Sequence, residues 1–175
     1  MQNKPVLLEI GFGMGHHLIE LAKQNPDKYI IGVDPFLNGI AEVIFTCVRE
    51  KIENIFISAC PIQEFLEEFK KLYFDEVFIL FPDPWPKKKH HKRRLFQANF
   101  IKMILKKIIS KGRLFFATDN EDYYEKSLLS LEEDVSKTTP ILIQKKDNKR
   151  LVLTKYFKRA QKLGNNVNFL VIVKL

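Results

Sequence analysis

Apolar and polar positions follow two periods along the chain, and their alternation predicts an α/β fold. Continuous apolar runs, typical of buried strands, occur at Val6–Ile10, Tyr29–Val33, Ile55–Ser58, Glu76–Phe81, Gly112–Thr118, Pro140–Gln144 and Val167–Lys174. Apolar residues at helical spacing predict helices at His16–Gln24, Leu37–Lys51, Pro61–Phe69, Phe96–Ile109 and from Asp119 or Asn120 to about Leu131. A short helix is also expected near Thr154–Leu163, before Gly164.

The order of these elements predicts how the sheet is wound. Five strands separated by helices require right-handed crossovers, and therefore a doubly wound, mostly parallel sheet with helices on both faces. The last two strands lack a full helical crossover, so they are expected to add an antiparallel hairpin at the C-terminal edge of a seven-stranded sheet. We expect one domain over residues 1–175. Ligands of such sheets bind beyond the carboxyl ends of the strands.

The charge of the chain is unevenly distributed. The formal net charge is +8, and six Lys or Arg and two His residues occupy the eight positions 87–94. A focused basic run favours a polyanionic partner such as nucleic acid. Cys47 and Cys60 have neither metal-ligand spacing nor a disulfide framework. With no transmembrane-length apolar stretch and no signal-peptide pattern, the chain is expected to avoid membranes and to act in the cytoplasm.

A glycine turn follows the first predicted strand. Gly11, Gly13 and Gly15 alternate with other residues, which permits a tight turn and close approach of a ligand. The dinucleotide fingerprint is incomplete, because its third glycine falls on His16. Glu9 lies in the apolar strand before the turn, where a lone carboxylate is costly. It is expected to accept hydrogen bonds from loop amides or from a ligand's charged amine.

A second carboxylate, Asp34, ends the second predicted strand, 19 residues after Gly15. A carboxylate there can accept from both hydroxyls of an adenosine ribose; the alternative is a helix cap. Glu9, the glycine turn and Asp34 together resemble the class I methyltransferases that use S-adenosyl-L-methionine. The resemblance implies a Rossmann-like fold of that class.

A proline-bracketed loop follows the fourth predicted strand. In Pro82-Asp83-Pro84-Trp85-Pro86 the prolines fix φ and remove amide donors, so a stiff irregular loop is expected through Arg94. A rigid carboxylate and indole beside dense positive charge suit a nucleic-acid base and its phosphates. Trp85 either stacks on the base or props the loop, and we favour propping. The competing interpretation is a solvated basic loop with Trp85 filling the core.

Three segments together resemble the bacterial tRNA (guanine-N7-)-methyltransferase family: 8–15 (LEIGFGMG), 81–90 (FPDPWPKKKH) and Ala117-Thr118-Asp119. The resemblance spans essentially the whole chain. It implies methyl transfer from S-adenosylmethionine to N7 of a guanine in the tRNA variable loop, position 46 in tRNA numbering. It also implies a cofactor site with Glu9, Asp34 and Asp83, a catalytic role for Asp83, and substrate contacts from Lys87, Asp119 and Thr154.

The chain departs from the family pattern in three places. Cys60 stands where an acidic residue usually follows the third strand, so Gln63 or Glu64 is a possible substitute at the cofactor site. Phe157 stands where the late motif usually has Glu. The chain also starts almost at its first strand, without the N-terminal extension of many family members.

The chemistry of the implied reaction assigns further roles. Guanine N7 carries a lone pair and no proton, so the enzyme must hold the base in line and place negative charge near it. Asp83 or Asp119 is the candidate group, although Asp119 is equally expected as a helix N-cap. Lys88, Arg93 and Arg94 are expected to bind phosphates. The basic segment 145–159 is either a second tRNA surface or a solvated helix face.

Other interpretations are weaker. His90 and His91 lack partners at metal spacing, so we expect no metal. Rival functions are an exocyclic-amine methyltransferase, a non-catalytic RNA-binding module on a methyltransferase fold and, more distantly, a nicotinamide oxidoreductase. The expected partner is tRNA, and the expected oligomeric state is monomer or homodimer.

Overall fold

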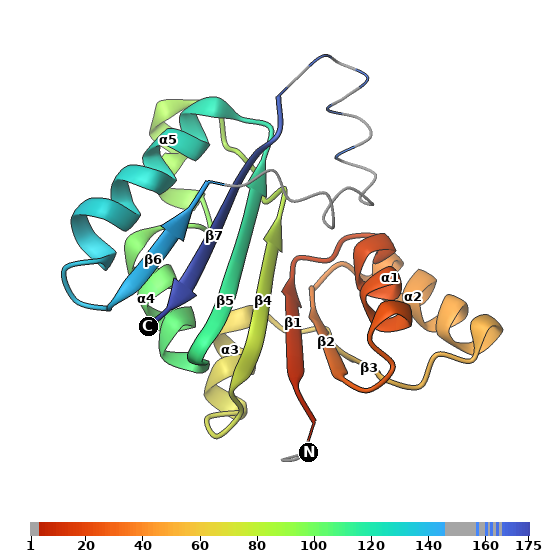
Figure 1. The fold of residues 1–175 in the computed structure, drawn as a ribbon. Helices are drawn as coiled ribbons and strands as arrows, with labels where there is room; N and C mark the ends of the chain where they lie inside the picture. The colour runs from red at the N-terminus through yellow and green to blue at the C-terminus, as the bar shows by residue number, and fades with distance from the viewer. Residues whose placement is uncertain (1–3, 146–156, 158–159, 161, 163, 165) are drawn as a thin grey trace.

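The computed structural model describes residues 4–145, 157, 160, 162, 164 and 166–175, which form one seven-stranded sheet flanked by helices (Figure 1). The strands are β1 (Val6–Ile10), β2 (Tyr29–Val33), β3 (Ile55–Ser58), β4 (Phe74–Leu80), β5 (Ile108–Thr118), β6 (Ile141–Gln144) and β7 (Asn168–Lys174). The helices are α1 (His16–Gln24), α2 (Leu37–Glu50), α3 (Ile62–Glu68), α4 (Ala98–Lys107) and α5 (Glu121–Ser130). A 3₁₀ segment, η1 (Lys88–Arg93), precedes α4, and a π-helical turn, η2 (Leu131–Val135), extends α5.

The strand order β3-β2-β1-β4-β5-β7-β6 confirms the predicted fold class. β1 to β5 are parallel, and β7 pairs antiparallel with both β5 and β6. Figure 1 shows the β7 arrow pointing against that of β5. The late hairpin is therefore placed as expected, with β7 inside the sheet and β6 at its edge.

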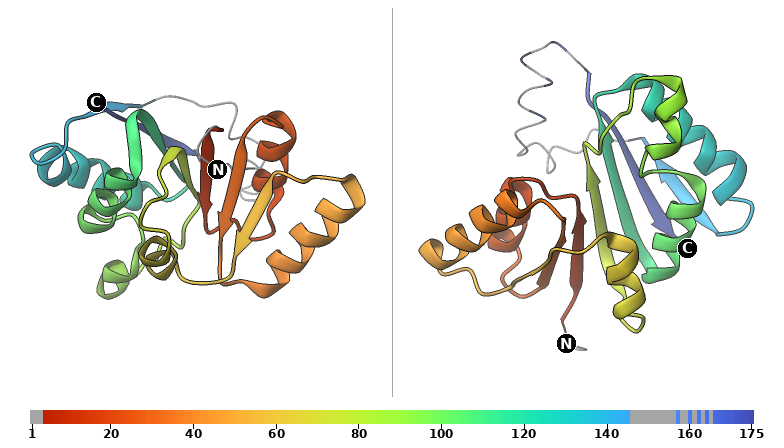
Figure 2. Two further views of the ribbon diagram at one scale, coloured as in Figure 1. Left: turned by 90° about the horizontal axis from the view of Figure 1, so that it is seen from below. Right: turned by 180° about the vertical axis from the view of Figure 1, so that it is seen from behind.

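Two apolar layers cover the sheet. One lies under α3, α4 and α5, which Figure 2 shows in front of the sheet in its right-hand view, and includes Ile79, Ile104 and Phe116. The other lies under α1 and α2 and includes Leu18 and Phe78. Strands buried on both faces explain why the sequence shows continuous apolar runs.

One element boundary differs clearly from its prediction. Helical spacing extends to Ile109, whereas the helix ends at Lys107 and β5 already begins at Ile108. Ile108 pairs with Phe74 of β4, so strand pairing prevails over helical periodicity at this junction. Gly112 follows in β5, where a Cβ would lie 2.8 Å from the Asp75 carbonyl oxygen.

Two further expectations concern loops and helices. The basic run is not wholly irregular, because Lys88–Arg93 forms a 3₁₀ segment. The helix expected near 154–163 lies largely outside the described residues, although Phe157, Ala160 and Lys162 are described as helical. No helix in the described part of the chain is long and apolar enough to cross a membrane.

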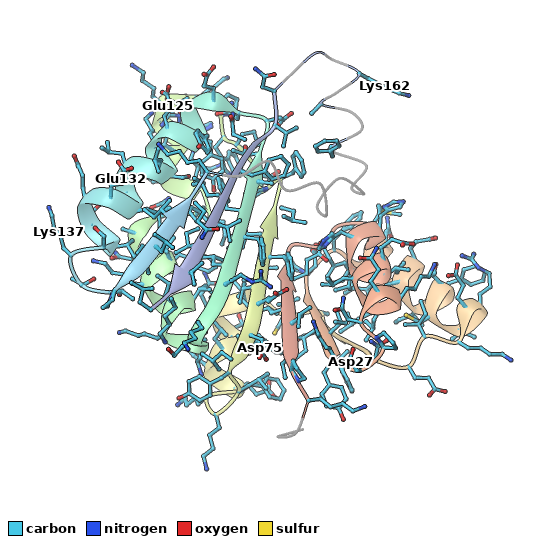
Figure 3. The ribbon with its side chains drawn as sticks, viewed as in Figure 1. Asp27, Asp75, Glu125, Glu132, Lys137 and Lys162 are labelled. Carbon is cyan, nitrogen blue, oxygen red and sulfur yellow. The ribbon has the colours of Figure 1, made fainter. Side chains whose placement is uncertain are left out.

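The predicted site residues in the described part of the chain lie on the side of the sheet where the parallel strands end. The glycine turn follows β1, Asp34 follows β2, the proline-bracketed loop follows β4 and Asp119 follows β5. Figure 3 labels Asp27 and Asp75 near the opposite edge, where the strands begin. We call the side of the sheet formed by the carboxyl ends of β1 to β5 the carboxyl-end edge.

Candidate active site

The glycine turn after β1 has a left-handed backbone. Gly11, Gly13 and Gly15 have φ values of 73°, 55° and 74°. A Cβ on Gly11 or Gly13 would have no heavy atom within 4 Å, so the turn presents an open face. A Cβ on Gly15 would lie 2.0 Å from Val43, and one on Gly39 1.7 Å from the Gly13 carbonyl oxygen. Helix α2 thus packs directly on the closed side of the turn.

Asp34 connects this turn to the end of β2. The residue is 7% exposed. Its Oδ2 accepts from the Gly13 amide at 2.7 Å, and its Oδ1 accepts from the Phe36 amide at 2.9 Å. Phe36, not Asp34, is the N-cap residue of α2, so the helix-cap alternative is wrong. Each carboxylate oxygen accepts two hydrogen bonds in favourable geometry. Asp34 therefore fixes the turn and keeps acceptor capacity for hydroxyl groups.

Glu9 has a partner that the sequence analysis missed. Its Oε2 lies 2.9 Å from His17 Nδ1 at the start of α1, and both side chains are at most 5% exposed. The expected loop-amide contacts are instead made by Asp34. A buried carboxylate requires a donor, and His17 follows the turn at once. This requirement was the available signal for His17.

Cys60 lies after β3, beside the other strand ends. Its Sγ is 3.1 Å from Ser58 Oγ, and its side chain packs against the apolar layer under α3. The Ser58 carbonyl accepts from the Asp34 amide at 3.1 Å, which joins this strand end to that of β2. Gln63 and Glu64, the proposed substitutes, are exposed on α3.

The proline-bracketed loop after β4 has a strained backbone at both ends. Phe81 has φ of 53° and Trp85 φ of 43°, which are left-handed values for bulky residues. Such conformations cost about 1–3 kcal/mol each and persist only where the surroundings enforce them. The Phe81 amide donates to the Ala117 carbonyl of β5 at 2.8 Å. The exposed Asp83 lies between the two strained positions.

Arg94 holds this loop from inside. Its side chain is 4% exposed, Nε donates to the Pro84 carbonyl at 2.8 Å, and one Nη donates to Asp122 at 2.7 Å. The guanidinium also lies over the Tyr123 ring, 4.6 Å from its centroid. The expected phosphate contact at Arg94 does not suit this burial. The sequence of the basic run gives no sign that Arg94, unlike its neighbours, is buried.

Helix α5 supplies the anchor for Arg94. Hydrogen bonds from Lys126 and then Arg94 lower the pKa of Asp122 to about 2. Burial raises the pKa of Tyr123 to about 12, and its hydroxyl accepts from the Phe96 amide at 2.8 Å. These contacts tie the segment before α4 to the start of α5.

The remaining cations of the run point outward. The η1 segment buries none of its residues, and Lys87, Lys88, Lys89, Lys92 and Arg93 are exposed. Cζ of Arg93 lies 4.9 Å from the centroid of the Trp85 ring. The rings of His90 and Trp85 have centroids 5.8 Å apart and an interplanar angle of 89°. The half-buried Trp85 thus packs within its own loop, which favours the propping interpretation.

The end of β5 presents the second exposed carboxylate. Asn120 is the N-cap of α5, and its side chain accepts from the Tyr123 amide at 2.8 Å, so Asp119 is not the cap. Thr154 lies outside the described residues. Phe157 stands where the family motif usually has Glu. It is 8% exposed, and its ring centroid lies 6.2 Å from that of Phe169, so this residue packs in the core.

The described residues contain no cluster of three or more His, Cys, Asp or Glu side chains that is suited to a metal ion. His91 instead faces Lys126 at 3.1 Å and Asp122 at 3.7 Å. Four carboxylates lie at this edge: Asp83 and Asp119 follow β4 and β5, Glu9 lies near the end of β1, and Asp34 follows β2.

Comparisons with known proteins agree with this architecture. A family described as "Putative methyltransferase" matches residues 3–170. A tRNA (guanine-N(7)-)-methyltransferase of Wolbachia pipientis is 34% identical over 95% of this chain and 73% of its own length. The enzyme of that name from Actinobacillus pleuropneumoniae is 38% identical over 98% of this chain and 70% of its own length. This chain also matches 33% of the length of a bifunctional methyltransferase of Rickettsia felis, at 34% identity over 98% of this chain.

Solved structures support the fold independently. A precorrin-6y C5,15-methyltransferase of Geobacter metallireducens superposes with a TM-score of 0.65 at 16% identity, over 99% of this chain and 83% of that one. At this identity the likeness concerns the fold alone. The family match and the relatives carry the assignment: the chain belongs to the tRNA (guanine-N7-)-methyltransferase family, whose cofactor is S-adenosyl-L-methionine.

Proposed function

We propose that this protein methylates N7 of a guanine in the tRNA variable loop, at position 46 in tRNA numbering. One arrangement carries the proposal. The exposed Asp83 and Asp119 follow adjacent strands β4 and β5, and β4 also pairs with β1, which leads to the open glycine turn. A base held by these carboxylates therefore lies close to a methyl donor held at the turn.

The residues at the turn fit the methyl donor. S-adenosylmethionine supplies an electrophilic methyl group on a sulfonium, together with a ribose and an amino-acid portion. The open sides of Gly11 and Gly13 leave room for it. Asp34 has the acceptor capacity for the ribose hydroxyls, and Glu9 offers a carboxylate to the ammonium group. Cys60 adds no charge where the family usually has an acid.

Asp83 and Asp119 act on the base. The N7 lone pair forms the new N–C bond while the S–CH₃ bond breaks, and no proton leaves the nucleophile. The positive charge moves from sulfur to the purine ring. A carboxylate that accepts from guanine N1–H and the exocyclic amine orients N7 and stabilises this developing charge. We assign this role first to Asp83, because its loop is held on both sides.

The outward cations bind the phosphates of the tRNA. Lys87, Lys88, Lys89, Lys92 and Arg93 project from one short segment next to Asp83, without an ion pair to another described residue. They are therefore available to neutralise phosphates, which releases counterions condensed on the polyanion. Such contacts position the substrate and leave the choice of base to the loop.

The loop geometry argues against the exocyclic-amine alternative. That reaction is associated with an Asp/Asn-Pro-Pro-aromatic motif, whose second proline would fall at Trp85. Proline is restricted to φ near −65°, whereas Trp85 has φ of 43°. The observed loop is therefore inaccessible to a Pro-Pro sequence.

Place of action and assembly belong to the same proposal. Cys47 and Cys60 are both free thiols, which suits the reducing cytoplasm, where tRNA is found. We propose a cytoplasmic monomer or homodimer.

The proposal is tested with labelled S-adenosylmethionine and unmodified tRNA, followed by borohydride reduction and aniline cleavage at 7-methylguanosine. We expect one cleavage in the variable loop, and none in a tRNA that carries adenosine at position 46. Mass spectrometry of the digested nucleosides separates N7 from amine methylation. Label on an exocyclic amine contradicts the proposal, and failure to bind the cofactor favours the RNA-binding module.

A further inference from the structure

The Glu9–His17 pair is the most deeply buried pair of titratable groups at the carboxyl-end edge. Glu9 Oε2 and His17 Nδ1 are 2.9 Å apart, and their side chains are 4% and 5% exposed. Glu9 lies next to the last residue of β1, where it is paired with Gly32 of β2 on one side and with Phe78 of β4 on the other. The His17 ring packs against Phe78 with centroids 5.1 Å apart. The pair therefore lies beneath the glycine turn, in an apolar layer.

The contact between the two side chains has a direction. A carboxylate only accepts hydrogen bonds, so a bond between the Glu9 carboxylate and His17 at this distance has Nδ1 as its donor. Packing against Phe78 and the start of α1 fixes the ring plane. His17 thus occupies one oxygen of Glu9 and sets the direction of the carboxylate.

Without this donor, Glu9 would be a buried carboxylate with no hydrogen bond to another described residue. A buried carboxylate without a donor is unfavourable, so its side chain would turn toward water. That movement would take the carboxylate away from its position beneath the turn. The function of Glu9 therefore depends on His17.

We propose that His17 is a positioning residue for cofactor binding. By donating from Nδ1 to Oε2, it holds the Glu9 carboxylate in place and directs Oε1 toward the ammonium group of the amino-acid portion of S-adenosylmethionine. This inference rests on the proposed function, because it requires the methyl donor to bind at the glycine turn. Under this inference, Glu9 of β1 and His17 of α1 together recognise the amino-acid portion of the cofactor, whereas Asp34 binds the ribose.

Two ligands and a series of substitutions test the inference. The ligands are S-adenosylhomocysteine, which retains the amino-acid portion, and 5′-methylthioadenosine, which lacks it; their dissociation constants are measured by calorimetry. His17→Leu should weaken S-adenosylhomocysteine about 10-fold or more and leave 5′-methylthioadenosine within about 2-fold. Glu9→Gln should produce the same selective loss, and the double variant should lose no more than either single variant.

Conservative variants separate the hydrogen bond from the shape of the side chain. Asn presents its amide nitrogen near the position of Nδ1, so His17→Asn should retain S-adenosylhomocysteine binding within about 3-fold. Gln extends its donor toward the position of Nε2, so His17→Gln should lose binding as His17→Leu does. His16→Asn, at the adjacent exposed histidine, is the matched control and should change neither constant. If His17→Leu does not fold, the Asn and Gln variants decide the question.

The outcomes distinguish this inference from the proposed function. Unchanged S-adenosylhomocysteine binding in His17→Leu and His17→Gln, or an equal loss for both ligands, overturns the positioning role. Absence of S-adenosylhomocysteine binding by the wild-type protein overturns the role and the methyltransferase activity together. Wild-type cofactor binding without tRNA methylation rejects the proposed substrate alone.

Discussion

The carboxylates in the two halves of the carboxyl-end edge differ in their exposure to solvent and in their partners within the protein. Glu9 and Asp34, on β1 and after β2, are 3% and 7% exposed and accept hydrogen bonds from within the protein. Asp83 and Asp119, after β4 and β5, are exposed and have no ion pair to another described residue. We interpret the difference, in line with the proposed function, as a preorganised site for a small cofactor beside a site whose polar partners come from a large substrate.

Asp83 provides the severest test of this comparison. Asp83→Ala should reduce kcat at saturating tRNA by roughly 10²–10³-fold, because a carboxylate aimed at developing charge contributes several kcal/mol to the barrier. S-adenosylhomocysteine affinity should change much less, since the glycine turn remains intact. Steady-state assays with labelled cofactor at saturating tRNA measure kcat, and calorimetry measures the affinity for S-adenosylhomocysteine.

Asp27→Asn is the control for Asp83. Asp27 is exposed near the opposite edge of the sheet (Figure 3), so the same loss of a negative charge there should leave kcat unchanged. A kcat for Asp83→Ala equal to that of the wild type would remove Asp83 from the mechanism and leave Asp119 as the candidate.

The neighbouring arginines of the basic run should have different effects. Arg94→Ala leaves the Pro84 carbonyl without its donor and should lower the free energy of unfolding by about 2 kcal/mol. Arg93→Ala removes an exposed side chain and should change it by less than about 0.5 kcal/mol. Urea denaturation measures both. Equal effects of the two substitutions would refute the structural role of Arg94.

The sequence was sufficient to predict the sheet and to place the candidate residues after the ends of its parallel strands. Buried parallel strands produce continuous apolar runs, and the absence of a late crossover indicated an antiparallel strand near the end. The boundary between α4 and β5 at Ile108 could not be predicted from the sequence. The helical spacing of apolar residues continues through this position, whereas pairing of Ile108 with Phe74 places it in the strand. A local pattern does not report the competition between two elements.

The contacts within the candidate site were harder to predict than the positions of its residues along the chain. The glycine turn and Asp34 follow from spacing after strands. His17 as the partner of Glu9 depends on the path of α1 across the sheet, which no motif records. Arg94 looks like its basic neighbours in the sequence, and only the fold turns it toward Pro84 and Asp122.

The exposed half of the edge should respond to salt. The logarithm of the tRNA binding constant falls with log[salt], and each phosphate contact removed makes this slope shallower by about one unit. The combined substitutions Lys88→Ala, Lys89→Ala and Arg93→Ala should therefore make it shallower by about three units. Binding of tRNA is measured by fluorescence anisotropy from about 50 to 200 mM salt. The catalytic rate at saturating tRNA should change less than the affinity.

A triple substitution elsewhere controls for net charge. Lys70, Lys71 and Lys137 are exposed outside the carboxyl-end edge, and their replacement by Ala removes the same total charge. Their loss should change the slope by well under one unit. If both triple variants lower the slope equally, tRNA responds to the overall charge of the protein, and η1 is not its binding surface.

The smallest effect concerns the anchor of Arg94. Hydrogen bonds from Lys126 and Arg94 lower the pKa of Asp122 from 3.8 to about 2. An acid with a lowered folded-state pKa stabilises the protein above its unfolded-state value, and this stability is lost as the pH falls from about 4 to 2. Because the Asp122 side chain is 50% exposed, solvent screening limits the contribution to about 0.2–1 kcal/mol.

Asp122→Asn isolates this contribution from the other carboxylates, which titrate in both proteins. The free energy of unfolding should favour the wild type at pH 5, and the difference between the two proteins should shrink toward pH 2, since only the wild type gains a proton at this position. Urea denaturation at several pH values measures the difference. A constant difference would show that Arg94 is held by geometry alone, with no charge required on α5. The exposed half of the edge would then rest on the Pro84 contact instead of on an ion pair.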